Sequence, residues 1–157
     1  MAKMGSADFS ELKKLQENLN KMVGTEDATN AFCEACAKEL AARLLRTVIK
    51  RTPVGVYPAG SGRVGGTLRR GWTAGSDNVQ QALNNLNVTK NGSVYTIEIT
   101  NPVEYASYVE YGHRTANHSS WVPGKFMMAI SENEIRRIVP QLLEKRLTEF
   151  LKGAFDA

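Results

Sequence analysis

The feature that most constrains this chain is a long amphipathic segment at residues 27–51. Apolar side chains recur along it at four-residue steps, from Phe32 to Val48. This period predicts an α-helix with one apolar face. The helix should end at Thr52-Pro53, because the residue before a proline avoids helical backbone angles. At about 1.5 Å per residue it would span roughly 37 Å, enough to cross a whole domain.

Composition places this helix in an ordinary globular protein. The chain has 157 residues, of which 42% are apolar and 23% are charged. That length suits one domain with one sizeable core. No run is apolar enough to cross a bilayer, and the N-terminus lacks the apolar stretch of a signal peptide. We therefore expect a soluble protein that folds in the cytoplasm and has no membrane partner.

A shorter amphipathic helix is predicted at residues 8–22, where apolar residues recur at three- and four-residue steps. Gly24 marks its end. A helix of this length is marginal alone, so it should dock on the body of the protein or on a neighbouring subunit. We expect residues 1–24 to form an N-terminal helix or arm, and residues 25–157 to form a single domain.

The last helix is predicted at residues 125–152, again from its apolar period. Pro140 lies inside it and should kink or split it, because proline lacks the N–H that the helix needs.

Strands are expected between the long helices. Residues 68–75 suit a strand, and residues 83–90 and 93–100 suit a hairpin whose tight turn is Asn91-Gly92. The element order is then helix, helix, small antiparallel sheet, helix. We predict an α+β fold in which long helices pack on a small antiparallel β-sheet in a single domain.

Residues 53–67 interrupt this pattern with five glycines and two prolines. We expect a long, mobile loop, because loops of this length are usually functional or disordered in isolation. Within it, residues 60–65 match the letters G-x-G-x-x-G. That nucleotide-binding fingerprint needs a strand before it and a helix after it. A flexible loop is the favoured interpretation.

Positive charge is unevenly distributed. The net charge is +4, and from Lys38 to Arg70 the only acid is Glu39. A one-sided basic band suggests an acidic partner, either nucleic acid or an acidic protein face. A solvated helix face followed by a basic loop is an equally good interpretation. The band comprises Lys38, Arg43, Arg46, Lys50, Arg51, Arg63, Arg69 and Arg70.

The sequence gives little support for a catalytic site or a metal site. Glu110, His113 and His118 could in principle bind a metal ion, but a loop with this spacing fixes no geometry. We expect Glu110 to pair with an arginine and His113 to donate a hydrogen bond. Cys33 and Cys36 lie inside the long helix without a second cysteine pair, so Cys36 is predicted to be a small core residue. We assign no catalytic residue, metal or cofactor.

Aromatic and arginine side chains give a more coherent pattern between residues 69 and 121. Tyrosine, tryptophan and arginine are the residues that anchor protein interfaces. The alternative is that these side chains form a core under the long helix, with their polar tips at its edge. Some of these residues can belong to an interface while others belong to the core. The candidate interface residues are Arg63, Arg69, Arg70, Trp72, Tyr108, Glu110, Tyr111, His113, Arg114 and Trp121.

Three blocks of the chain resemble a family of small tailed-phage proteins, the minor tail components known as tail completion or head–tail joining proteins. The first block is the end of the long helix with Thr-Pro-Val-Gly at residues 52–55, and the second is Gly-Gly-Thr-Leu-Arg-Arg-Gly-Trp at residues 65–72. The third runs from Asn-Pro-Val-Glu-Tyr-Ala at residues 101–106 to Val-Glu-Tyr-Gly-His-Arg at residues 109–114, closed by Pro-Gly-Lys-Phe-Met at residues 123–127. Together they cover residues 30 to 135. The N-terminal helix is similar to that of members from contractile-tailed phages.

The resemblance implies a structural, non-enzymatic protein of the virion, at the head-proximal neck of the tail. Such proteins form a ring, often sixfold, between the tail tube or its terminator and the connector below the capsid. The implied partners are other copies of the chain, the tail terminator or tail tube protein and the head–tail connector. The basic band also allows DNA in the ring lumen. A DNA-binding accessory protein without sequence specificity, using Lys38 to Arg70, is the alternative function.

Within the third block, the run from Tyr105 to Arg114 is interpreted as a structural hinge. We expect Tyr105 and Val109 to turn inward and Gly112 to permit a tight backbone turn. Glu110 and Arg114 are then candidates for holding the loop or a neighbouring subunit.

Overall fold

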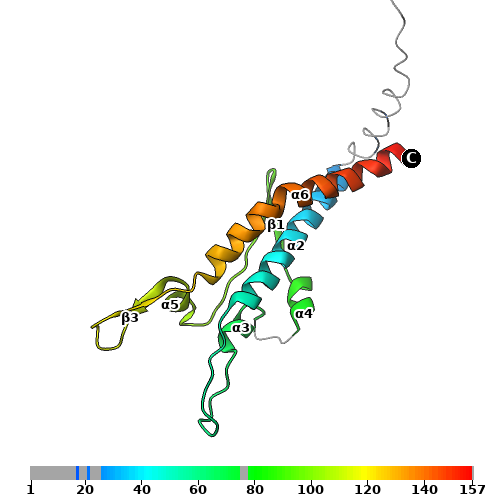
Figure 1. Cartoon of the computed structure of the whole chain (residues 1–157). Coiled ribbons are helices and arrows are strands. Elements are labelled where there is room, and N and C mark those ends of the chain that lie inside the picture. Colours follow the sequence, from blue (N-terminus) through cyan, green and yellow to red (C-terminus); the bar gives the residue numbers. More distant parts are fainter. Residues whose placement is uncertain (1–16, 18–20, 22–25, 75–77, 157) are drawn as a thin grey trace, which may run out of the picture. The chain divides into compact units, whose positions relative to one another are not determined.

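The computed structural model describes residues 17, 21, 26–74 and 78–156 of the chain (Figure 1). The chain divides into two compact units. One comprises Met1–Cys36 together with Gln141–Ala157, and the other comprises Ala37–Pro140. The helix predicted at residues 8–22 lies outside the described residues, apart from residues 17 and 21.

The predicted long helix is confirmed as α2, Glu26–Arg51. Glu26 and Asp27 lie in its first turn and Lys50 and Arg51 in its last, so charges at both ends complement the helix dipole. The helix ends where predicted, at Thr52, whose hydroxyl donates a 2.6 Å hydrogen bond to the Val48 carbonyl.

The last helix, α6, runs as one element from Met127 to Asp156. Pro140 lies inside it and does not split it. Proline leaves the carbonyl four residues earlier without its helical partner. Both Arg136 and Pro140 are exposed, so water can satisfy that carbonyl.

The strand predicted at residues 68–75 is wrong, because this segment begins with a short helix, α3, Thr67–Gly71. Leu68, Gly71 and Trp72 are all buried, and this three-and-four spacing belongs to a helix face. The residue before α3 is Gly66, whose φ of 93° lies in the left-handed region and therefore favours glycine.

The predicted hairpin is confirmed in a shortened form. Strand β1, Val88–Asn91, pairs antiparallel with β2, Val94–Ile97. The turn residues are Gly92 and Ser93, one residue later than the predicted Asn91-Gly92, because Asn91 pairs with Val94. The first part of the strand predicted at residues 83–90 is wrong, since α4 occupies Val79–Asn84. The Asn78 side chain caps α4 by accepting from two backbone N–H groups, which favours a helix start there.

A second small sheet was not predicted. After α5, Ala106–Tyr111, strand β3, Gly112–Arg114, pairs antiparallel with β4, Trp121–Pro123. Residues 115–120 form the connection between these two strands. The described structure therefore confirms the α+β class, with two separate two-stranded sheets rather than one.

The core of the Ala37–Pro140 unit is built mainly by helices. Its buried centre joins α2, α3 and the start of α6, and partly buried residues from α4, α5 and the segment after β2 pack against it. Burying these side chains supplies the main stabilisation of the unit. The central residues are Leu45, Val48, Leu68, Trp72 and Met127.

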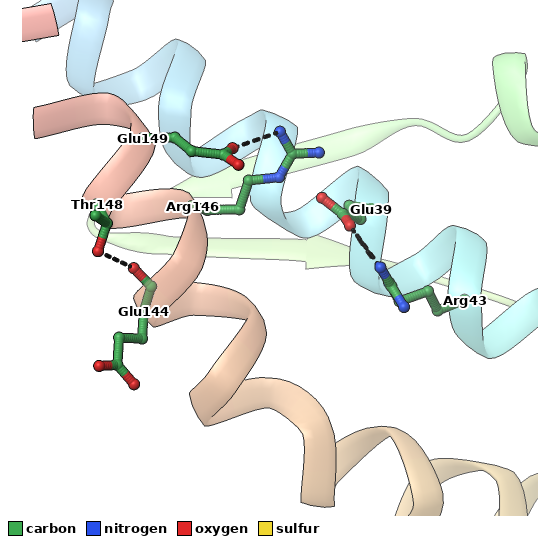
Figure 2. Close-up of polar contacts among 6 residues, drawn as sticks. All are labelled: Glu39, Arg43, Glu144, Arg146, Thr148 and Glu149. Carbon is green, nitrogen blue, oxygen red and sulfur yellow. Dashed lines mark hydrogen bonds and ion pairs between the residues drawn. The ribbon is translucent and has the colours of Figure 1, made fainter. Parts of the chain in front are cut away.

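The other unit is described over the start of α2 and the end of α6. The rings of Phe32 and Phe150 lie 4.6 Å apart in a tilted contact. Along α6, Arg146 pairs with Glu149 at 3.7 Å, and the Thr148 hydroxyl donates to the Glu144 carbonyl at 2.8 Å (Figure 2). These exposed pairs add little to stability.

Candidate interface

Glu110 is the central residue of the candidate site, and its role differs from the prediction. The expected pairing with an arginine is wrong. The side chain is buried in the last turn of α5 and accepts hydrogen bonds from the backbone N–H groups of Met128 and Ala129, at 3.0 and 3.1 Å. Those groups lie in the first turn of α6. A carboxylate there satisfies unpaired helix donors and complements the positive end of the helix dipole.

Backbone contacts reinforce the carboxylate. The N–H of Lys125 donates to the Val109 carbonyl at 2.7 Å, and the N–H of Phe126 donates to the Glu110 carbonyl at 3.0 Å. The chain between β4 and α6 is thus held against the end of α5 by main chain and side chain together. We call this arrangement, centred on Glu110, the carboxylate clamp.

Gly112 permits the close approach that the clamp requires. Its φ is 88°, and a Cβ added there would lie 2.5 Å from the Val122 carbonyl oxygen and 2.8 Å from the Gly124 nitrogen. The predicted tight turn at Gly112 is therefore confirmed, and the reason includes lack of space as well as backbone conformation.

Three large aromatic side chains project to solvent from the same region. Tyr108 is 58% exposed, Tyr111 67% and Trp121 57%. We call these three residues the aromatic face. Tyr108 and Tyr111 come from α5, whose other side places Ala106 and Val109 against the core. Exposed aromatics on a rigid backing are typical of protein interfaces.

The expected inward direction holds for one of the two hinge residues. Val109 is partly buried and packs on the core, as predicted. The prediction for Tyr105 is wrong, since this side chain is exposed. It precedes the first helical residue of α5, so it falls at the edge of the buried side rather than on it. His113 lies beside the aromatic face, with its ring 5.7 Å from that of Tyr108.

Two predicted interface residues hold the fold instead. Trp72 is buried in the core, and its indole N–H donates to the Thr52 hydroxyl at 2.8 Å. The Arg69 guanidinium donates to the Thr52 carbonyl, also at 2.8 Å. Thr52 is itself fully buried. Together these bonds fix the point where the chain leaves α2.

Residues 53–66 form the irregular segment that the sequence predicts, since Thr67 already begins α3. Figure 1 shows two extended stretches that meet at a narrow end, where the Ser61 N–H donates to the Pro58 carbonyl at 3.1 Å. Val56 is 93% exposed and Val64 is 77% exposed. We call residues 53–66 the arm.

Near its tip and base the arm is held by weak contacts. The Arg63 guanidinium lies 5.9 Å from the centre of the Tyr57 ring, within the range of a cation–π contact. Arg70 donates a long 3.4 Å bond to the Gly65 carbonyl. Nothing else that carries charge lies on the arm, which is apolar and rich in glycine.

The residues of the basic band differ in whether they contact other parts of the chain. Arg43 pairs with Glu39 on α2 (Figure 2), and Arg51 pairs with Glu134 on α6. Arg69 and Arg70 bond the backbone, as described above. Arg46 and Lys50 are exposed, and no hydrogen bond or ion pair connects either with another described residue. Among the described residues they are the cations of the band most open to a partner.

The described part of the chain contains no arrangement of side chains suited to binding a metal ion. No group of three His, Cys, Asp or Glu side chains there could hold a metal ion. Both carboxylate oxygens of Glu110 already accept backbone hydrogen bonds. Cys36 is buried, as predicted, and Cys33 is partly buried. None of the described helices combines the length and apolarity needed to span a bilayer.

Comparison with protein families identifies a relationship. A family model described as "Bacteriophage HK97-gp10, putative tail-component" matches residues 13–112. Neither the curated proteins nor the solved structures contain a significant match. The matched region includes α2, the arm, α3 and the whole of α5 with Glu110 and Gly112. The resemblance noted from the sequence is thereby confirmed: the chain belongs to the HK97 gp10-like family of phage tail components.

Proposed function

We propose that this tail component is a structural protein of the tail neck, which forms a ring that completes the tail and joins it to the head connector. The observation that carries the proposal is the aromatic face. Three exposed aromatic side chains stand on a segment that the carboxylate clamp holds rigid, and the chain belongs to a family of tail components. No catalytic role is proposed for any residue.

Ring formation is supported by the presence of two unlike projections on one unit. A ring closes through a heterologous contact, in which one surface of a subunit meets a different surface of the next. The arm offers exposed valines and the clamp region offers the aromatic face. We propose that sixfold rings form through these surfaces, with Arg63, His113 and Arg114 at the edge of the contact.

The proposed partners beyond the ring are the tail terminator or tail tube protein on one side and the head–tail connector on the other. Assembly would take place in the host cytoplasm, and the product would lie in the neck of the virion. Reconstruction of intact particles by electron cryo-microscopy tests this placement directly. A reconstruction with this chain located away from the neck would refute the proposal.

Variants at the aromatic face test the contact surface. We expect Tyr108→Ala with Tyr111→Ala to leave the stability of the isolated protein nearly unchanged and to lower the yield of infectious particles. Val94→Ala, which changes an exposed apolar residue on the separate β1–β2 hairpin, is the matched control. Normal particle yield from the tyrosine variant would exclude this face as an assembly contact.

A second candidate function is binding of DNA without sequence specificity, either in the ring lumen or as an accessory protein. Its support is the pair of exposed cations Arg46 and Lys50, one turn apart on α2. Such binding should weaken steeply as salt rises, because each phosphate contact releases counterions. Arg46→Ala with Lys50→Ala should then lower the affinity for duplex DNA and flatten the salt dependence. Unchanged affinity would exclude this candidate surface.

A further inference from the structure

Two adjacent arginines line a recess at the base of the arm. Arg69 and Arg70 lie on α3, directly after the arm, and both side chains are partly buried. The recess has a volume of about 320 Å³, and apolar side chains from α2, the arm and α4 contribute to its wall. These side chains are Ile49, Val54 and Val79. Apolar walls with a few convergent polar groups are typical of binding pockets.

The two guanidinium groups are only partly engaged within the chain. Arg69 donates to the Thr52 carbonyl, and Arg70 donates one long bond, of 3.4 Å, to the Gly65 carbonyl. No carboxylate of the described residues forms an ion pair with either arginine. A guanidinium carries five N–H donors. Most of the donors of Arg70 are therefore free to bind an acceptor from outside the chain.

The positive charge of Arg69 is partly removed from water without a counter-charge. Its Nε is buried, and no acceptor from the described part of the chain reaches it. Burying a charge that has no compensating partner is unfavourable. A carboxylate in the recess would stabilise both arginines, because it would accept charge-assisted hydrogen bonds from Arg70 and attract the neighbouring charge of Arg69.

We propose that this recess, which we call the arginine recess, binds an acidic side chain, a glutamate or an aspartate, of a protein partner other than this chain. The planar donor fork of arginine matches the two oxygens of a carboxylate. The methylene groups of a glutamate would lie against the apolar part of the wall while its carboxylate faces Arg70. The proposal goes beyond the neck function and depends neither on ring formation nor on placement in the neck.

The surroundings of the recess favour a protein side chain over DNA. Arg46 and Lys50 lie exposed on a helix surface, where the phosphates of a duplex can approach. The arginines of the recess are instead partly buried among three elements. A phosphate of the DNA backbone also carries no apolar stem that could cover Ile49 and Val54. The two sets of cations therefore suit different ligands.

The charge balance of the chain favours a different protein over a second copy. The unit that holds the recess contains thirteen Lys and Arg but seven Asp and Glu. Three of these acids are already engaged, since Glu39 and Glu134 pair with arginines and Glu110 is buried in the carboxylate clamp. A second copy has few free carboxylates to offer, so a partner with an acidic surface is the better source.

Side-chain NMR of the full-length ¹⁵N-labelled protein tests the site, with a hexaglutamate peptide as the probe. The titration is run at about 0.15 M salt, where charges farther apart than roughly 8 Å are largely screened. We expect the peptide to shift the Nε–H signal of Arg70 more than that of Arg46, and we expect a hexaglutamine peptide to shift neither. A larger shift at Arg46 would overturn the proposal.

Variants of the arginine separate the recess from general charge attraction. Arg70→Gln should weaken hexaglutamate binding at least about tenfold, because charge-assisted hydrogen bonds are lost, and Arg70→Lys should weaken it less. The thermal midpoint of Arg70→Gln should stay nearly unchanged, since its one side-chain bond within the chain is long. Arg46→Gln removes the same charge from an exposed site and is the matched control. An equal loss of affinity in Arg46→Gln and Arg70→Gln would overturn the proposal.

Two further arms identify the source of the acidic group. A short DNA duplex that shifts the Arg70 signal more than the peptide does would assign the recess to phosphate and overturn the proposal. In particles, Arg70→Glu should lower the infectious yield, and suppressors that restore it should place a lysine or arginine in a different protein. Suppressors confined to this chain would assign the carboxylate to a second copy and overturn the proposal. The neck placement is tested separately by the particle reconstruction, so either proposal can fail alone.

Discussion

The Ala37–Pro140 unit carries two projections that differ in how the chain is tied. The segment 112–123 is a hairpin with a regular ladder between β3 and β4, anchored at its base by the carboxylate clamp. The arm, residues 53–66, has no strand pairing and is held at its base through Thr52. Each projection leaves apolar side chains in water. Only the 112–123 hairpin has its backbone groups satisfied by regular internal hydrogen bonds.

This difference separates two kinds of exposed surface. A projection that is fixed internally presents side chains in a set geometry, and little entropy is lost when a partner binds. A projection with unpaired backbone groups can gain hydrogen bonds only from water or from a partner, and ordering it on binding costs free energy. We infer that the aromatic face acts as a preformed platform and the arm as the adaptable element.

The largest effect is expected at Gly112 compared with Gly60. Both have positive φ, of 88° and 82°, but nothing lies within 4 Å of a Cβ added at Gly60. Gly60→Ala should cost only about 1 kcal/mol of backbone strain. Gly112→Ala should cost roughly 3 kcal/mol or more, because the new methyl group also meets two backbone atoms. Urea unfolding of both variants measures the difference, and equal losses would show that the clamp hairpin is no tighter than the arm.

The next largest effect is expected at the clamp itself. Glu110→Ala removes two hydrogen bonds to a helix start and leaves their donors unpaired, so the free energy of unfolding should fall by roughly 2–3 kcal/mol. Glu110→Gln should lose less, because one side-chain oxygen remains. Assembly into infectious particles should fall with Glu110→Ala. Glu104→Ala, an exposed carboxylate just before α5, is the matched control, and a loss as large as that of Glu110→Ala would contradict the clamp.

A smaller effect is expected where the arm begins. Thr52→Val keeps the shape of the side chain but removes the acceptor for the Trp72 indole and the bond to the Val48 carbonyl. We expect a loss of roughly 1–2 kcal/mol, since the Trp72 N–H is left buried without a partner. Thermal unfolding followed by tryptophan fluorescence measures it. Thr47→Val removes a comparable hydroxyl bond to the Arg43 carbonyl at a less buried site of α2 and should cost less.

Helices with a long apolar period could be predicted from the sequence. The limits of α2 and α6 follow the pattern closely, and the Asn91-Gly92 signal located the turn of the first hairpin to within one residue, because each of these signals is local. The five residues of α3 were too few to distinguish the apolar period of a helix from that of a strand. Leu68 and Trp72, four apart, share a face in a strand as well as in a helix.

The clamp could not be predicted, because its partners are far apart along the chain. Glu110 binds backbone N–H groups of residues 128 and 129, and backbone donors carry no signature in the sequence. Trp72 and Tyr108 are both aromatic, yet one lies in the core and the other in solvent. That difference depends on the tertiary packing around each residue.

The smallest effect on stability, and the sharpest test of the adaptable element, is expected at the arm. Val56→Ser with Val64→Ser changes two side chains that are almost fully in water, so the free energy of unfolding should stay within about 0.5 kcal/mol of the wild type. If the arm docks on a partner, the same variant should lower particle yield, because docking would bury both valines. Unchanged stability with unchanged yield would remove the arm from the assembly contact and leave the aromatic face as the remaining proposed surface. A large loss of stability would instead show that the valines are buried within the isolated subunit, which would contradict the contrast between the two projections.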